Sequence, residues 1–210
     1  MATVPLSAHE THEKKKAPPV AGVLPVFHER WSPRSFQDRD VSPETLAKIF
    51  EAARWAASSN NEQPWRFLVG TRGSETYQNI FESLVEFNRK WAGTAPVLVL
   101  GTTRATFSRG GAANRHALYD LGAATSYMTL QAAALGVATH QMAGFDPEKA
   151  RTLLGIPAGY DIGAVIAIGY QDDPAKLSDP AFIERELAPR ERKPLGEIVF
   201  EAWDHPMDLE

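Results

Sequence analysis

The residues best suited to chemistry form one compact polar run at positions 58–65 (SSNNEQPW). Within it, Asn61 and Gln63 each carry a carbonyl acceptor and an NH2 donor on one planar head, which suits the edge of a heterocycle on which donors and acceptors alternate. Because Pro64 restricts the residue before it, we expect Gln63 to be extended and the run to be stiff. A polar turn anchored to the core by Trp65 accounts for the same residues, since turns are rich in Asn and Ser.

Two basic clusters lie far apart in the chain. Arg30 and Arg34 flank Ser32, and a second cluster near the C-terminus contains Arg190 and Arg192. Arginine binds phosphate through charge-assisted, two-pronged contacts, although the first cluster taken by itself fits an exposed basic turn better than a phosphate site. Together with the amide-rich run and a small-residue segment at 141–144 (QMAG), the clusters indicate a cofactor with a phosphate at one end and a polar heterocycle at the other.

Composition excludes several other classes of function. The 210-residue chain has no Cys, which rules out disulfides, thiolate metal sites and cysteine nucleophiles and fits a reducing cytoplasm. The glycine, serine and histidine patterns of the common catalytic motifs are missing, and the six His are scattered, so we expect no metal site. A net charge of −4 argues against a nucleic-acid-binding surface. The sequence contains no apolar run of about 18 residues, the length that a membrane-spanning helix needs.

Helical and strand patterns interleave, which indicates an α/β or α+β fold. A helix start at residues 42–44 (SPE) precedes apolar residues at helical spacing, so this helix delivers the amide-rich run from its C-terminal end. Residues 102–113 predict a mobile binding loop. Residues 1–22 predict an unstructured extension, which leaves residues 23–210 as one domain. The other expected helices cover 73–91, 114–135 and a segment capped by residues 146–148, and the expected strands cover 66–70, 96–100, 136–139, 162–170 and 197–203.

Four blocks of the chain resemble the FMN-dependent nitroreductase family: residues 30–36 (RWSPRSF), 58–67 (SSNNEQPWRF), 136–146 (GVATHQMAGFD) and 190–195 (RERKPL). The resemblance implies an α+β fold whose central mixed or antiparallel sheet is flanked by helices, in a domain-swapped homodimer with FMN at the interface. Helix 114–135 would be central to that dimer, and the terminal strand would reach across to the partner.

The same resemblance implies a role for each candidate site residue. Arg30, Ser32 and Arg34 would hold the FMN phosphate and ribityl chain, and Arg190 and Arg192 would complete the phosphate site. Asn61 and Gln63 would bind the pyrimidine edge of the flavin. The remaining candidates would lie along the ring, with a backbone N–H near flavin N5; they are Gln141, Met142, Ala143 and Gly144.

The implied activity is that of an NAD(P)H oxidoreductase in which the chemistry takes place on FMN N5, so no catalytic side chain is expected. NADH or NADPH would reduce the flavin, and a nitroaromatic, quinone or similar small molecule would then take the electrons in a ping-pong cycle. Two other interpretations stay open. One is a narrower flavin enzyme on the same fold, such as a reductive dehalogenase or a flavin-degrading enzyme, and the other is a non-catalytic FMN-storage protein.

Overall fold

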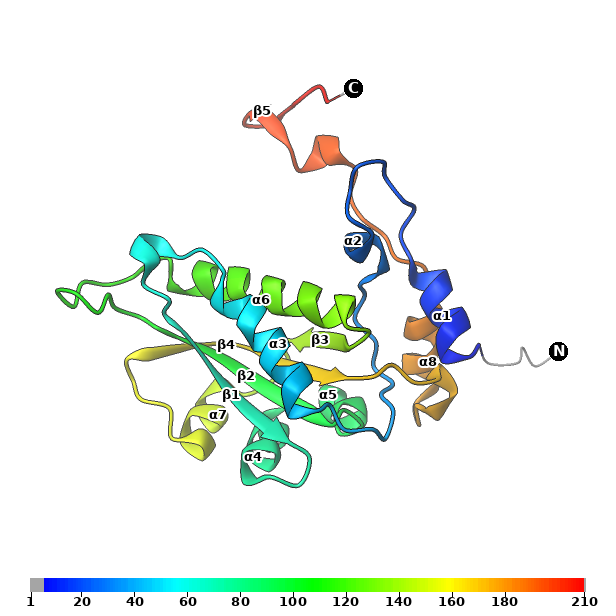
Figure 1. The fold of residues 1–210 in the computed structure, drawn as a ribbon, viewed down its shortest axis with the longest axis horizontal. Helices are drawn as coiled ribbons and strands as arrows, with labels where there is room; N and C mark the ends of the chain where they lie inside the picture. The colour runs from blue at the N-terminus through cyan, green and yellow to red at the C-terminus, as the bar shows by residue number, and fades with distance from the viewer. Residues whose placement is uncertain (1–5, 210) are drawn as a thin grey trace.

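A four-stranded antiparallel sheet forms the centre of the computed structural model, which describes residues 6–209 (Figure 1). Its strand order is β1-β2-β4-β3, and each neighbouring pair is antiparallel. β2 and the second half of β4 are buried, because helices cover the sheet on both faces. This arrangement confirms the predicted α+β class. The strands are β1 (Trp65–Thr71), β2 (Val97–Arg104), β3 (Ala138–Met142) and β4 (Tyr160–Gly169).

Helices α3 (Pro43–Arg54) and α6 (Ala117–Ala134) cover one face of the sheet. Ser42 caps α3 by accepting a hydrogen bond from the Thr45 N–H, and Pro43 takes the first helical position, as the sequence predicts. α3 therefore ends just before the amide-rich run. The core between these helices and the sheet contains Ile49, Val97, Val99, Leu121, Ala124, Met128 and Ile166.

The opposite face is covered by α4 (Glu75–Ser83), α5 (Glu86–Ala92) and α7 (Pro147–Leu154). The single helix predicted over residues 73–91 is wrong, because the structure divides it at Leu84. Leu84 pairs with Phe145 in an isolated bridge, and the Val85 N–H donates to the Gly144 carbonyl at 3.1 Å. These bonds need extended backbone at residues 84 and 85, which ends α4.

The N-terminal segment corrects the prediction of an unstructured extension over residues 1–22. Helix α1 (Ala8–Lys15) begins with a capping box between Ser7 and Glu10 and packs against α8 (Pro180–Leu187). A short helix α2 (Pro25–Glu29) follows, and residues 1–5 lie outside the described part of the chain. The exposed surface of α1 is polar, so its order depends on the tertiary contacts that it makes.

The C-terminal residues form an arm that projects away from the sheet and its helices (Figure 1). The arm holds a 3-10 turn, η3 (Leu195–Glu197), and a two-stranded ribbon of β5 (Phe200–Ala202) and β6 (His205–Pro206). Only part of the strand predicted over residues 197–203 is therefore present. Among residues 6–209, no helix is long and apolar enough to cross a bilayer.

The segment predicted as a long loop, residues 102–113, is shorter than expected because β2 continues to Arg104. The rest closes on itself: the Phe107 N–H donates to the Ala112 carbonyl at 2.8 Å, and Thr106 and Ala113 form an isolated bridge. Ser108 then donates two hydrogen bonds to the Glu62 carboxylate, at 2.7 Å from its N–H and 3.1 Å from its hydroxyl. These bonds connect the loop to the amide-rich run.

Candidate functional site

Arg30 is a cation that has no carboxylate partner in the described part of the chain. It lies at the C-terminal end of α2, and its Nη1 donates to Ser32 Oγ at 3.2 Å. Burial lowers the pKa of Arg30, and repulsion from Arg192 lowers it further. Within residues 6–209 no Asp or Glu forms an ion pair with it. A half-buried guanidinium in this state favours an incoming anion.

Arg190 and Arg192 share this environment, as the sequence predicts for the two basic clusters. Arg190 Nη1 donates to two backbone carbonyls, those of Lys15 at 2.9 Å and His28 at 2.8 Å. Burial lowers the pKa of Arg190, and repulsion from Arg30 and then Arg192 adds to that effect. Three guanidiniums close enough to repel one another, none with an ion pair in the described part of the chain, form a positive site whose charge a phosphate dianion would largely offset.

Arg34 differs from these three residues because its charge is already compensated. Its Nη1 and its backbone N–H both donate to the Glu186 carboxylate, each at 3.1 Å. Glu186 is 1% exposed, and burial raises its pKa while Arg34 opposes that rise. The Arg34 guanidinium also lies over the Trp91 ring. Arg34 therefore has a structural ion pair, and its assignment to the cofactor, like that of Ser32, stays a prediction.

Strand β3, which leads into the segment at 141–144, lies next to the Arg30–Arg34 segment. His140 Nδ1 is 2.9 Å from the Pro33 carbonyl, which can only accept, so Nδ1 carries the proton. The His140 ring packs on Trp91 at 4.4 Å between centroids. Burial lowers the pKa of His140 to about 4, and repulsion from Arg34 contributes. A neutral imidazole therefore joins β3 to the first basic cluster.

The small-residue segment itself is held by neighbours that the sequence did not single out. The Gly144 carbonyl accepts from Asn88 Nδ2 at 2.9 Å, and a Cβ at Gly144 would lie 2.6 Å from that nitrogen. Gln141 is exposed, with Nε2 3.3 Å from Thr129 Oγ1, and Ala143 is exposed. The side chain of Met142 is buried in the core, so only its backbone can face a ligand. Asn88 thus shapes the segment.

The amide-rich run adopts a strained conformation. Asn60, Asn61 and Gln63 have positive φ values of 54°, 54° and 50°, which non-glycine residues rarely adopt. The expectation that Gln63 is extended is therefore wrong. Its N–H is held by Ser58 Oγ at 2.9 Å and its Nε2 by the Asn61 carbonyl at 3.2 Å, so the turn closes on itself. The Asn61 side chain is exposed at the surface of this fixed turn.

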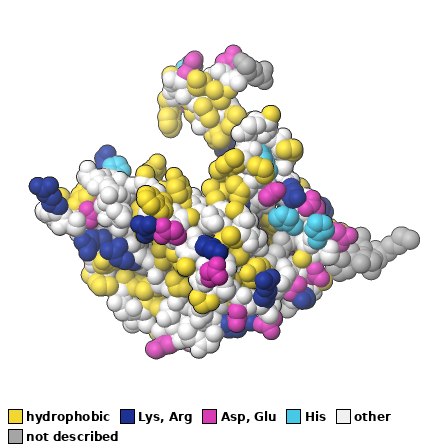
Figure 2. Space-filling view, viewed as in Figure 1, with side chains coloured by type: hydrophobic (Ala, Val, Ile, Leu, Met, Phe, Trp, Pro, Cys, Tyr) yellow, Lys and Arg dark blue, Asp and Glu magenta, His cyan; other side chains and the backbone are white. Residues whose placement is uncertain are grey.

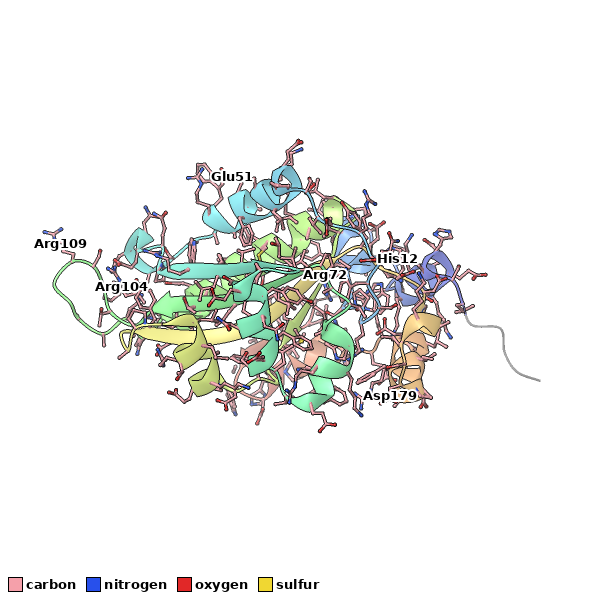
Figure 3. All side chains as sticks on the ribbon, turned by 90° about the horizontal axis from the view of Figure 1, so that it is seen from below. His12, Glu51, Arg72, Arg104, Arg109 and Asp179 are labelled. Atoms are coloured by element: carbon pink, nitrogen blue, oxygen red, sulfur yellow. The ribbon has the colours of Figure 1, made fainter. Side chains whose placement is uncertain are left out.

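The amide-rich turn and the cationic cluster lie at opposite ends of α6. The Ser59 N–H donates to Asp120 at the start of the helix, at 3.1 Å. Arg30 lines a cavity of about 350 Å³ together with Ala134 at the end of the helix. At about 1.5 Å per residue, Asp120 and Ala134 are roughly 20 Å apart. Figure 3 shows the same separation: Arg104, next to the amide-rich run, and Arg109 lie at one end of the molecule, and His12, which lines the cavity, at the other.

Single-chain geometry thus brings together the two basic clusters and segment 141–144, but not Asn61 and Gln63. Thr139, one of the residues that line the cavity, has a buried Oγ1 with no hydrogen-bond partner in the described chain, and the same is true of Arg34 Nε, outside the cavity lining. Residues 6–209 contain no group of His, Cys, Asp and Glu residues that could hold a metal ion.

Large apolar side chains are exposed around this region. They line both sides of the hollow between the C-terminal arm and the rest of the molecule (Figure 2). Contiguous apolar surface of this kind marks an interaction site. The large apolar residues that are exposed on these elements are Leu24 just before α2, Phe27 on α2, Leu118, Tyr119 and Tyr127 along α6, and Leu195, Ile198, Trp203 and Met207 on the arm, with Trp203 88% exposed.

Comparison with known proteins places the chain in a family. The model of the Nitroreductase family matches residues 28–90 and 71–170. A curated 15.4 kDa protein from Mycolicibacterium smegmatis, described as uncharacterized, is 33% identical over 150 residues, which cover 68% of this chain and 99% of that protein. The chain belongs to the Nitroreductase family.

Solved structures agree with this assignment. A crystal structure of an oxidoreductase containing FMN has a TM-score of 0.81 and 36% identity, covering 89% of this chain and 94% of the other. A putative nitroreductase from Desulfovibrio desulfuricans in complex with FMN has a TM-score of 0.67 and 28% identity, covering 88% and 98% of the two chains. The chain therefore has the nitroreductase-like fold that the four sequence blocks predicted.

Proposed function

We propose that this protein is an FMN-dependent oxidoreductase that takes electrons from NADH or NADPH and passes them to nitroaromatic, quinone or similar small molecules. The observation that carries this proposal is the cationic cluster of Arg30, Arg190 and Arg192, which has no carboxylate partner in the described residues and lies beside β3, the strand that leads into segment 141–144. Support comes from a relative in Archaeoglobus fulgidus, named a putative NADH dehydrogenase/NAD(P)H nitroreductase, which is 29% identical over 158 residues covering 71% of this chain and 86% of the relative.

The residues present fit FMN. The guanidiniums of Arg30, Arg190 and Arg192 offer donors to a phosphate that brings the negative charge their site lacks. When bound, FMN supplies reversible two-electron chemistry at N5. The exposed Ala143 and the Gly144 backbone, fixed by Asn88, would form the wall beside the ring. Asn61 and Gln63 would bind the pyrimidine edge by their amide groups.

The site is complete only if two copies of the chain contribute to it. In one chain the amide-rich run with Asn61 and Gln63 lies at the start of α6 and Arg30 at its end, and the helix rises roughly 20 Å between these two points. A domain-swapped homodimer would bring the amide-rich turn of one protomer to the cationic end of its partner. It would also cover the apolar residues of α2, α6 and the C-terminal arm. Sedimentation of the purified protein should give the mass of a dimer, and a monomer that still holds FMN would contradict this part.

The absorbance spectrum of the purified protein tests the proposed function directly. We expect flavin bands that bleach on anaerobic addition of NADPH or NADH and return when a nitroaromatic or quinone is added. A flavin spectrum that neither donor bleaches would favour FMN storage, or another donor. Reduction without transfer to these acceptors would favour a narrower flavin enzyme. A colourless protein that takes up no added FMN would refute the proposal.

A further inference from the structure

Helix α1 lies outside the part of the chain that the family model matches, which begins at residue 28. Its contacts nevertheless lead to the cationic end of the site. At its first residue, the Ala8 carbonyl accepts from Gln171 Nε2 at 2.9 Å, and the Ala8 N–H donates to Asp173. Along its length, His12 lines the same cavity as Arg30, and Trp31 Nε1 donates to His12 Nδ1 at 3.4 Å. α1 is thus fixed at several points.

The last residue of α1 makes the decisive contacts. Lys15 is only 5% exposed, and its ammonium donates to the carbonyls of Arg185 at 3.0 Å and Ala188 at 2.6 Å, at the C-terminal end of α8. A cation satisfies the carbonyls that a helix leaves unpaired at this end. The same ammonium lies 5.1 Å from the centre of the Trp31 ring. Lys15 therefore joins α1, α8 and the first basic cluster.

Lys15 also positions Arg190. Its backbone carbonyl accepts from Arg190 Nη1 at 2.9 Å, and the His28 carbonyl accepts from the same nitrogen at 2.8 Å. Arg190 follows the end of α8 by three residues, so Lys15 holds both the guanidinium and the backbone from which it comes. Because two carbonyls bind Nη1, the planar guanidinium is held in one orientation, and its remaining N–H groups stay available to a ligand.

The charges around Lys15 are mostly positive. Burial lowers the pKa of Lys15; attraction by Glu186 opposes this effect, while repulsion from Arg34, Arg190 and Lys14 adds to it. Among residues 6–209, Glu186 is the buried carboxylate that lies beside Lys15 and Arg34, and it already pairs with Arg34. An excess of partly buried positive charge is costly unless an anion joins it. The phosphate of the cofactor would be that anion.

We propose that α1 is a built-in clamp for the cofactor phosphate, in which Lys15 is the positioning residue that fixes Arg190. This inference rests on the proposed FMN function and adds a segment beyond the family match to it. Without the Lys15 ammonium, the last turn of α1 is no longer held against the end of α8, so the Lys15 backbone carbonyl and the Arg190 guanidinium that it binds lose their fixed positions, and the phosphate would lose ordered contacts. The isoalloxazine ring has no phosphate and makes no contact with this clamp in the proposal, so its binding should not depend on Lys15.

Parallel titrations with FMN and riboflavin test the clamp, because riboflavin has the ring but no phosphate. The variant is Lys15→Met, and the matched control is Lys14→Met, which removes the same charge from an exposed neighbouring residue. Flavin fluorescence quenching gives the Kd of each ligand with the full-length, flavin-free protein. We expect Lys15→Met to weaken FMN binding about tenfold, the scale of a lost charge-assisted contact, and to change riboflavin binding less than about twofold. Lys14→Met should change neither ligand by more than about twofold.

Each other outcome has a defined meaning. An unchanged FMN Kd in Lys15→Met would overturn the clamp, and so would an equal loss for FMN and riboflavin, since that would show only a general structural role. If Lys15→Met does not fold, Lys15→Gln replaces it, because the amide can still donate to one of the two carbonyls; its FMN-selective loss should be smaller than tenfold but measurable. Failure of the wild-type protein to bind FMN at all would refute the proposed function instead.

Discussion

His140 gives the protein a pH-dependent stability that follows from its surroundings. The imidazole is largely buried between Trp91 and the Pro33 carbonyl, and burial, aided by Arg34, lowers its pKa from 6.5 to about 4. Since the folded-state pKa lies below the unfolded one, the unfolded chain takes up the proton first as the pH falls. The resulting stability is complete above pH 6.5 and is lost progressively between pH 6.5 and about 4.

The size of this effect follows from the pKa values. At about 1.4 kcal/mol for each pKa unit, the full lowering corresponds to about 3 kcal/mol of folding free energy, most of which is lost by pH 4.5. The variant His140→Gln does not titrate, and its amide can still donate to the Pro33 carbonyl. Between pH 7.5 and pH 4.5 the unfolding free energy of the wild-type protein should therefore fall by about 2–3 kcal/mol more than that of the variant.

Urea unfolding followed by tryptophan fluorescence at several pH values measures this difference. Taking the difference between the two proteins removes the contributions of the other titrating groups, because these are common to both. Curves of unfolding free energy against pH that run parallel for wild type and His140→Gln would refute the reasoning. They would mean that His140 is protonated in the folded protein at the same pH as in the unfolded chain.

Four substitutions test other parts of the site. Arg192→Ala should weaken FMN binding by about 1.5 kcal/mol, the lower end for a charge-assisted contact because Arg192 is exposed; unchanged affinity in a fluorescence titration would contradict its assignment. Asn61→Ala should change the flavin's potential or affinity in a redox titration, and values equal to wild type would leave Asn61 as a turn residue only. Glu186→Gln should lower the unfolding free energy by about 3 kcal/mol, because it leaves the Arg34 guanidinium without its ion pair; a urea midpoint equal to wild type would show that the pair is not stabilising. Gly144→Ala should cost about 1–3 kcal/mol by crowding Asn88, which a lower Tm would report and an unchanged Tm would exclude.

The sequence by itself determined the elements that local chemistry specifies. Ser42 and Pro43 start α3 where their capping preferences place it, and Asp146 starts α7 by accepting from the N–H groups of Glu148 and Lys149. The four family blocks predicted the nitroreductase-like fold, and the two basic clusters do meet in space. These features depend on residues near one another in the chain, or on patterns that stay recognisable without coordinates.

Tertiary structure decided the features that depend on distant partners. Helix 73–91 is broken because Leu84 and Val85 pair with residues about 60 positions later, and a local pattern contains no sign of that pairing. Gln63 takes a positive φ because Ser58 and Asn61 close the turn around it, against the local preference set by Pro64.

The polar extension before residue 23 carried no apolar stripe that would predict docking. α1 is ordered because the Lys15 ammonium caps the end of α8 and the Lys15 carbonyl accepts a hydrogen bond from the Arg190 side chain. Both partners lie more than 160 residues later in the sequence. The sequence likewise does not indicate that Glu186 is buried in an ion pair. Glu186 lies four residues after Phe182, on the buried face of α8, and only the tertiary structure shows that its partner is Arg34. Contacts between segments this far apart contribute their free energy only when the whole chain has folded, so tertiary structure alone assigns them.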